Sequence, residues 1–173
     1  KIETYLAEFQ HNDATNREGM AARIYFNSLF GVKFTRENSQ CSINKALNYG
    51  YAILLSAFNR EISANGYILQ LGLHHNNQFN AFNLSCDIME PFRPIVDNLV
   101  YCMMPDKFET EEKRKLQDIL NHTVKFQGAS QVVNYAIGLY CRSVFQAIEK
   151  SDSNLVVFAV PEYCQTQESD VPF

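Results

Sequence analysis

Two histidines and two carboxylates lie close together in the middle of the chain. His74 and His75 belong to an asparagine-rich loop, and Asp87 and Glu90 follow in an expected helix. Residues three apart on a helix share a face, so Asp87 and Glu90 can point the same way. A loop imidazole beside helical carboxylates is the raw material of a site for a divalent metal ion that prefers oxygen ligands. We therefore expect any chemistry of this protein to be located here.

Four long helical patterns must position these residues, and they indicate a mainly α fold. Apolar residues recur at the spacing that places them on one face of a helix. The spacing predicts long helices over 15–30, 42–62, 84–104 and 130–149, and a short charged helix over 110–121. Extended chain is expected only in short pieces near 124–126 or 155–160, and the state of residues 67–73 stays open.

The ends and the interior of these helices carry recognisable signals. Thr15 is expected to cap the first helix, with Glu18 three residues on as in a capping box, and Ser42 is expected to cap the second. Pro91 and Pro94 lie inside the third pattern, so a bend is expected near Glu90. The predicted buried faces are Leu47, Gly50, Tyr51, Leu54, Leu55 and Phe58 in the second helix, and Val133, Ile137, Tyr140, Val144, Phe145 and Ile148 in the last.

Length and composition are those of one globular domain. The chain has 173 residues, of which 46% are hydrophobic and 20% charged, enough for a core of its own. No run of about 18 apolar residues occurs, so we expect no membrane span. The chain opens without an initiator Met and without a signal-peptide pattern, and we interpret it as a piece of a longer protein. We divide it into a linker or helix end at 1–14, a helical domain at 15–150 and a tail at 151–173.

Cysteine spacing and net charge bear on location and partners. The five cysteines form no CxxC pair and are odd in number, which favours reduced thiols in a cytoplasmic protein over a zinc site. The net charge of −4 and the pI of about 5.6 argue, taken alone, against a nucleic-acid partner. The charge argument is weak here, because the carboxylates of a metal site count as negative charges until the metal ion is bound.

Several segments together resemble one protein family. They are Asn16-Arg17-Glu18-Gly19 with Ala21-Ala22-Arg23-Ile24-Tyr25-Phe26, Leu47-Asn48-Tyr49-Gly50-Tyr51, Leu71-Gly72-Leu73-His74-His75-Asn76, Phe82-Asn83-Leu84 and Asp87-Ile88-Met89-Glu90-Pro91-Phe92-Arg93-Pro94. This order resembles the C-terminal helical domain of CRISPR-associated protein one, the integrase of spacer acquisition, and the double histidine is most similar to the type II branch. The resemblance covers roughly residues 12–150, and the family's N-terminal β-rich domain is expected to be missing.

The resemblance implies a set of metal ligands. The family binds one divalent ion through a glutamate, a histidine and a second acid, which by motif are Glu18, His75 and Glu90. His75 is preferred to His74 because the family's ligand is fourth in a run that here reads Gly72-Leu73-His74-His75. Asp87 matches a further family acid as a ligand or as an outer-shell partner, and His74 is placed in a supporting role.

The chemistry of this trio is consistent with such a site. Two carboxylates and one neutral imidazole carry two negative charges, which a divalent cation balances. Oxygen ligands suit Mg²⁺ or Mn²⁺, and the imidazole favours Mn²⁺. The ion would act as a Lewis acid and a template for phosphate chemistry.

The family also implies partners and a reaction. In it, a free 3′-hydroxyl of a prespacer attacks a phosphodiester of the CRISPR repeat, so DNA is the expected partner. The full-length form is expected to be a homodimer that assembles with CRISPR-associated protein two in the cytoplasm. For this chain alone we expect weak self-association and no tight DNA binding at physiological salt.

Simpler interpretations stand beside these. Glu18 can be only the capping-box partner of Thr15, the loop histidines can be structural, and Asp87 and Glu90 can form a solvated helix face. Arg93 can pair with a nearby acid. Four loop asparagines are expected to satisfy backbone groups rather than bind DNA, namely Asn76, Asn77, Asn80 and Asn83. The whole chain can accordingly be a non-catalytic helical binding or assembly module, or, less favoured, a stand-alone nuclease.

Overall fold

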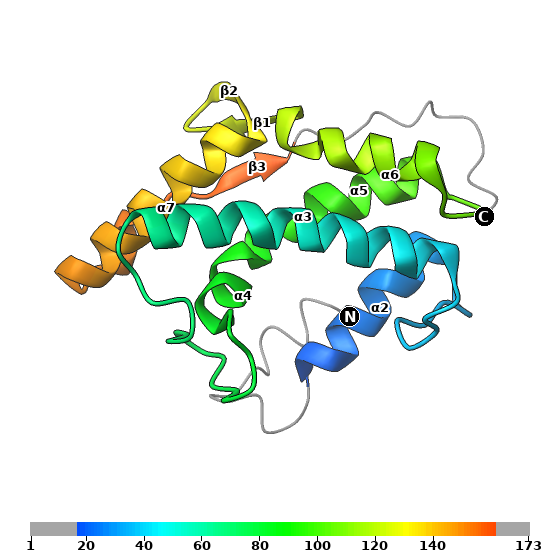
Figure 1. Ribbon diagram of the computed structural model, residues 1–173, viewed down its shortest axis with the longest axis horizontal. Coiled ribbons are helices and arrows are strands. Elements are labelled where there is room, and N and C mark those ends of the chain that lie inside the picture. The colour runs from blue at the N-terminus through cyan, green and yellow to red at the C-terminus, as the bar shows by residue number, and fades with distance from the viewer. Residues whose placement is uncertain (1–16, 162–173) are drawn as a thin grey trace.

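The computed structural model describes residues 17–161 and has a long helix, α3 (Ser42–Ala64), at its centre. In Figure 1, α3 runs across the molecule with α2 and α4 on one side and α6 and α7 on the other. The other helices are α2 (Arg17–Phe30), α4 (Asn83–Met89), η2 (Glu90–Phe92), α5 (Arg93–Met103), α6 (Thr110–Gln117), η3 (Asp118–Asn121), α7 (Val133–Lys150) and η4 (Ser153–Leu155). The predicted mainly α fold is confirmed. None of the helices within 17–161 combines the length and apolar character needed to cross a membrane.

A small antiparallel sheet closes one side of the helical domain. β1 (Thr123–Phe126) lies between β2 (Ala129–Val132) and β3 (Ala159–Pro161). β1 and β3 occupy the two places where extended chain was predicted. The predicted start of the last helix at Ser130 is wrong, because residues 130–132 pair with β1 and the helix begins at Val133. The segment predicted as a tail thus contributes a strand to the domain.

The predicted bend near Glu90 is confirmed as a break in the helix. The pattern from residue 84 to 104 forms α4, one 3-10 turn and α5. Pro91 lies in the first turn of η2 and Pro94 in the first turn of α5, where a missing backbone N–H costs least. Glu90 is the first residue of this 3-10 turn.

The ends of α3 are formed differently from the prediction. Ser42 is the first residue of the helix and does not cap it; its hydroxyl donates to the carbonyl oxygen of Asp106 at 2.9 Å. At the other end the chain turns at Gly66, whose φ of +81° favours glycine. The expected cap of α2, Thr15, lies outside the described residues.

The core lies between α3, the α4–α5 segment and α7. On α3, the predicted residues Leu47, Gly50, Leu54 and Phe58 are buried. The ring centroid of Phe92 lies 5.3 Å from that of Phe58 and 5.4 Å from that of Tyr140 of α7. The predicted face of α7 is buried from Val133 to Phe145, but Ile148 is 39% exposed, so this part of the prediction is wrong.

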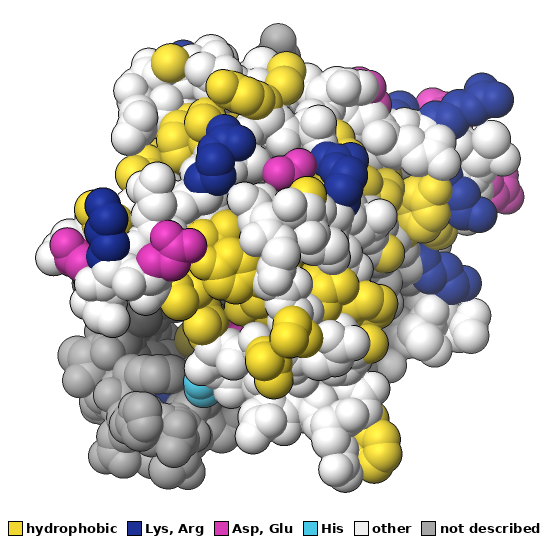
Figure 2. Space-filling view, turned by 60° about the vertical axis from the view of Figure 1, so that its left-hand side comes forward, with side chains coloured by type: hydrophobic (Ala, Val, Ile, Leu, Met, Phe, Trp, Pro, Cys, Tyr) yellow, Lys and Arg dark blue, Asp and Glu magenta, His cyan; other side chains and the backbone are white. Residues whose placement is uncertain are grey.

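The surface carries charged residues and scattered apolar side chains. Figure 2 shows one face on which hydrophobic side chains reach the surface in several places, with a histidine near its lower edge. The charge run of α6 is solvated as predicted, with Lys115 paired to Glu111 at 3.1 Å. Cys41, Cys86, Cys102 and Cys141 form no disulfide with one another, and Cys164 lies outside the described residues.

A close approach of α3 and α5 at Gly50 gives a stability prediction. A Cβ on Gly50 would lie 2.4 Å from Val96 Cγ1, so Gly50→Ala should lower the free energy of unfolding by about 1–3 kcal/mol. Gly138→Ala is the matched control. Its Cβ would meet only the flexible carboxylate of Glu61, at 3.3 Å, and the gain in helix propensity of about 0.5–1 kcal/mol should keep stability equal or higher. Urea unfolding of both variants tests this, and equal losses would contradict the packing argument.

Candidate functional site

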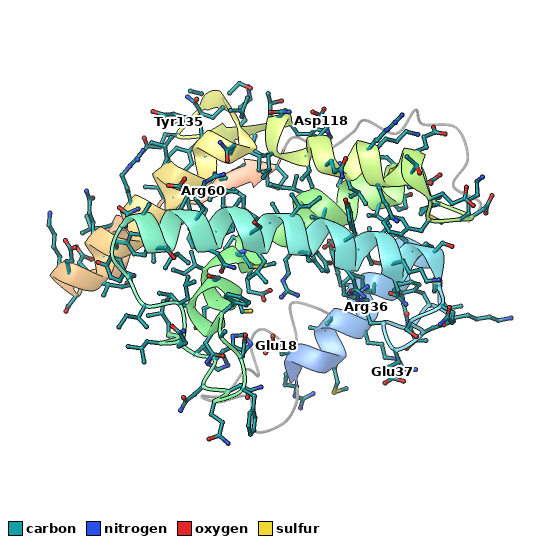
Figure 3. The ribbon with its side chains drawn as sticks, viewed as in Figure 1. Glu18, Arg36, Glu37, Arg60, Asp118 and Tyr135 are labelled. Carbon is teal, nitrogen blue, oxygen red and sulfur yellow. The ribbon has the colours of Figure 1, made fainter. Side chains whose placement is uncertain are left out.

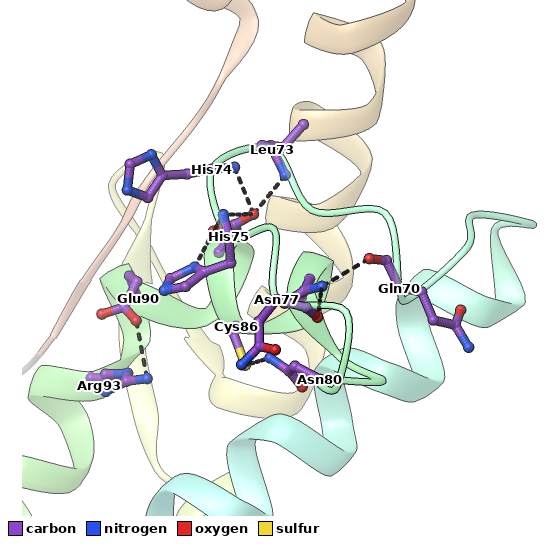
Figure 4. Close-up of polar contacts among 11 residues, drawn as sticks. Gln70, Leu73, His74, His75, Asn77, Asn80, Cys86, Glu90 and Arg93 are labelled. Carbon is purple, nitrogen blue, oxygen red and sulfur yellow. Dashed lines mark hydrogen bonds and ion pairs between the residues drawn. The ribbon is translucent and has the colours of Figure 1, made fainter. Parts of the chain in front are cut away.

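The histidine loop is held by one carboxylate, Asp87. Its oxygens accept the backbone N–H groups of Leu73, His74 and His75, at 2.6, 2.9 and 3.1 Å. Asp87 also receives a short hydrogen bond from Nδ1 of the His75 ring. Figure 4 shows these bonds converging on the turn that carries both histidines. The loop conformation therefore depends on a side chain from α4.

Hydrogen bonding determines the charge state of Asp87. Burial tends to raise its pKa, but the bonds from His74, His75 and Leu73 outweigh burial and hold the pKa below its ordinary value. Only 7% of the side chain is exposed, so the carboxylate is charged and fully engaged. Because a carboxylate only accepts, Nδ1 of His75 carries the proton and Nε2 is the ring nitrogen that can accept a metal ion. This arrangement favours a supporting role for Asp87.

Gly72 permits the close contact between loop and helix. A Cβ at this position would lie 2.2 Å from the His75 carbonyl oxygen and 2.8 Å from Asp87 Oδ2. Real side chains do not approach backbone atoms so closely, so the turn accepts only glycine here. We call the set of hydrogen bonds from Leu73, His74 and His75 to Asp87 the Asp87 cradle. His74 contributes its backbone N–H to it, and the His74 ring packs edge-on to the His75 ring, with 5.6 Å between the ring centroids.

Glu90 lies at the break between α4 and α5, paired with a cation. Its Oε1 is 3.0 Å from the Arg93 guanidinium, so the simpler interpretation of Arg93, a pair with a nearby acid, is confirmed. The same guanidinium lies over the Tyr51 ring of α3, 5.0 Å from its centroid. Glu90 keeps 47% of its side chain exposed and thus remains open to a ligand.

The electrostatic environment of Glu90 identifies its neighbours. Partial burial raises its pKa; Arg93 opposes this, the Glu18 carboxylate raises the pKa further, and His75 lowers it. Glu18 is exposed in the first turn of α2 (Figure 3). Charges on α2 and on the loop, which are far from Glu90 in the sequence, thus contribute to the pKa of Glu90.

The donor set fits a divalent ion by its chemistry, but the side chains are not arranged around one. Two carboxylates and the Nε2 of His75 match the ligands of Mg²⁺ or Mn²⁺. Within residues 17–161, no three His, Cys, Asp or Glu side chains are close enough together to hold a metal ion. Arg93 supplies the positive charge beside Glu90 instead.

Helix α2 is positioned by a buried acid that the sequence analysis did not single out. α2 has no fully buried residue, and its Tyr25 hydroxyl donates to Asp97 Oδ2 of α5 at 2.9 Å. Asp97 is 3% exposed and also accepts a short hydrogen bond from Tyr51. Burial raises the pKa of Asp97, while the two tyrosine hydroxyls oppose that shift. In the sequence, the only sign of this role was that the acidic Asp97 lies between the apolar residues Val96 and Val100.

A separate cavity of about 660 Å³ runs along the outer side of α2. Its lining includes Gly19, Arg23, Phe26, Lys33 and Arg36, but neither His75 nor Glu90. Figure 3 shows Arg36 and Glu37 at the opposite end of α2 from Glu18. The candidate site is therefore placed around Glu90 and not in this cavity.

Comparison with known proteins shows which family contains these segments. The family described as CRISPR associated protein Cas1 matches residues 6–125. The chain belongs to the Cas1 family. A CRISPR-associated endonuclease Cas1 of Neisseria meningitidis is 37% identical over 128 residues, which cover 73% of this chain and 42% of the relative. One from Francisella tularensis subsp. novicida is 35% identical, covering 63% of this chain and 37% of the relative.

A solved structure shares the fold of this Cas1 chain. A casposase bound to integration product superposes with a TM-score of 0.68 at 22% identity, covering 82% of this chain and 49% of the casposase. At that identity the likeness shows the fold alone. The chain spans less than half the length of the two Cas1 relatives above.

The depressed pKa of Asp87 gives a prediction of pH-dependent stability. A carboxylate whose pKa is lower in the folded state adds stability above its unfolded pKa of about 3.9, and that stability is lost as pH falls through the folded pKa. Asp87→Asn should lower the free energy of unfolding by about 1–3 kcal/mol at pH 7. The difference from wild type should narrow below about pH 4.

Urea unfolding at neutral and acid pH measures both effects. Asp118→Asn is the control: this acid is exposed, accepts from Asn121 Nδ2 at 2.7 Å and should change stability by less than about 0.5 kcal/mol. A difference between Asp87→Asn and wild type that is the same at every pH would contradict the cradle argument.

Proposed function

We propose that this Cas1 chain is the catalytic part of a metal-dependent DNA integrase that joins a DNA 3′-hydroxyl to a phosphodiester of a second DNA. Family membership supports this, as do the names of the relatives, which are endonucleases. The structural neighbour, which shares the fold, is described as a casposase bound to integration product. The observation that carries the proposal is the family match over residues 6–125, a range that includes Glu18, His75 and Glu90.

The proposed reaction exchanges one phosphodiester for another. The attacking hydroxyl forms a new P–O bond while the bond to the leaving oxygen breaks, and the hydroxyl proton ends on that leaving oxygen. A divalent ion held by Glu18, His75 and Glu90 would stabilise the charge that builds on the phosphate. Mg²⁺ or Mn²⁺ is the proposed cofactor, with Mn²⁺ favoured by the imidazole.

The chain's own residues would prepare this chemistry. Asp87 fixes the tautomer and the orientation of the His75 ring, so that Nε2 faces outward from the cradle. Arg93 holds the Glu90 carboxylate in place. Tyr25 and Asp97 fix α2, and with it Glu18, against α5. Prespacer and repeat DNA are the proposed substrates, and a homodimer with CRISPR-associated protein two is the proposed assembly, in the cytoplasm.

Manganese binding tests the proposed ligands directly. Glu18→Gln, His75→Ala and Glu90→Gln should each weaken Mn²⁺ binding, measured by calorimetry or paramagnetic resonance, by at least about 10- to 100-fold, the range seen even for outer-shell changes. His74→Ala should be milder, because its contribution to the cradle is a backbone N–H. Glu37→Gln, an exposed acid at the far end of α2, should leave Mn²⁺ binding unchanged.

The same variants should lose DNA joining in the complete protein to a far greater extent than thermal stability. Each replaces an exposed side chain, so core packing is unaffected. Mn²⁺ binding that survives all three changes would leave the non-catalytic helical module as the function of this domain. Cleavage of DNA without joining would instead favour a nuclease that uses the same site.

A further inference from the structure

Phe79 is an aromatic residue exposed to water in the same loop as His75 of the candidate site. Its side chain is 88% exposed, although burial of a phenyl ring is normally favourable. It lies four residues after His75, in the loop of residues 67–82 between α3 and α4 that contains no helix or strand. The conformation of the loop must therefore explain why this ring is exposed.

The loop around Phe79 is built by asparagine side chains. The Asn80 N–H donates to the Asn77 carbonyl at 3.0 Å, which closes a turn with Gln78 and Phe79 at its corner. Asn77 Oδ1 accepts the Phe79 N–H at 3.0 Å, and Asn80 Oδ1 accepts the Phe82 N–H at the same distance. These contacts confirm that Asn77 and Asn80 satisfy backbone groups, as the sequence predicted.

A buried residue anchors this turn to the domain. Asn83 is 3% exposed, and its Nδ2 donates to the carbonyl oxygens of Gln70 and Asn77, at 3.1 and 2.9 Å. Figure 4 labels Gln70 and Asn77, which accept these bonds, and Leu73, His74 and His75, which contact Asp87. The turn is thus fixed on both sides, so the exposure of Phe79 is a property of an ordered frame.

The surroundings of the ring suit a nucleic-acid strand. No Asp, Glu, Lys or Arg occurs from residue 62 to residue 86, so the loop has no carboxylate to repel phosphates. Gln78, the neighbour of Phe79 in the sequence, carries an exposed amide, and amides can both donate to and accept from base edges. Phe79 is the most exposed of the large apolar side chains of the loop, which also include Ile68, Leu71, Leu73 and Phe82, and its ring offers a flat stacking surface of about the size of one base.

We infer that Phe79 is a stacking platform for an unpaired nucleobase next to the reacting phosphate. The inference rests on the proposed function, since the strand that enters the site would bring its bases past the loop that carries His75. Every base has an aromatic face, so the contact would be tolerant of sequence. It would hold one nucleotide out of the duplex beside Glu90.

Binding of single-stranded DNA to the full chain tests the inference without chemistry. A fluorescein-labelled oligonucleotide, followed by anisotropy in EDTA and at low salt, should bind the Phe79→Ala variant about 5- to 100-fold more weakly than wild type. Phe79→Trp keeps an aromatic ring at this position and should bind the oligonucleotide about as tightly as wild type. Tyr135→Ala is the matched control, because Tyr135 is a 52% exposed aromatic on the opposite side of α3 from this loop (Figure 3). Thermal unfolding of Phe79→Ala should match wild type, since the ring is in water.

A series of oligonucleotides with one abasic site moved along the strand locates the contact. At the stacked position, loss of the base should weaken wild type but not Phe79→Ala. Equal binding of wild type and Phe79→Ala to every oligonucleotide would overturn the inference that Phe79 stacks on a base. Metal-dependent DNA joining by the wild type, measured separately, shows whether the proposed function survives. A change in sedimentation mass for Phe79→Ala with unchanged DNA binding would assign the ring to a protein contact and overturn the inference. Absence of both binding and joining in wild type removes the proposed function as well.

Discussion

One buried carboxylate joins the three helices on which the candidate site depends. Asp97 of α5 accepts hydroxyl hydrogen bonds from Tyr25 of α2 and Tyr51 of α3. A buried acid is costly to leave unpaired, so the two hydroxyls and the nearby cations must stay in place. Arg36 contributes to this balance, since its guanidinium lies 5.6 Å from the Tyr51 centroid and donates to Asn44 Oδ1 at 2.7 Å. Because α2 has no fully buried residue, its position depends on polar contacts and on the contact of Phe30 with Tyr101 of α5, whose ring centroids lie 6.4 Å apart.

The two acids that the sequence placed on one helical face have different surroundings in the fold. Asp87 stays in α4, is nearly buried and is saturated by N–H donors. Glu90 falls in the turn that Pro91 shortens, is half exposed and faces one guanidinium. The proline thus separates a carboxylate that builds the loop from a carboxylate that stays open to a ligand. The opposite shifts of their pKa values follow from this difference, since hydrogen bonds dominate at Asp87 and burial at Glu90.

Helical periodicity predicted the scaffold, but the details at its ends depend on tertiary contacts. The buried face of α3 and the break at Glu90 were readable, because apolar spacing and proline act locally. The β1–β2 hairpin was not. Its turn is Gln127-Gly128, with φ values of 50° and 81°, and a glutamine in a left-handed conformation gives no turn signal of the Asn-Gly kind. The role of Asp97 was equally hidden, because nothing local in the sequence pairs it with tyrosines 72 and 46 residues away. The ligand assignment came from motif order, which spacing alone does not supply.

Local charge, and not the net charge of −4, is what a DNA strand would meet at this site. The adjoining loop is neutral over 25 residues, from 62 to 86, so repulsion of phosphate would come mainly from Glu18, Glu90 and Asp87. Asp87 is already compensated by its hydrogen bonds, and Arg93 offsets Glu90. On the proposed function, a divalent ion would neutralise the remaining charge and at the same time attract the phosphate. Metal binding and DNA binding would then support each other, and an acidic chain would need no basic surface at the point of reaction.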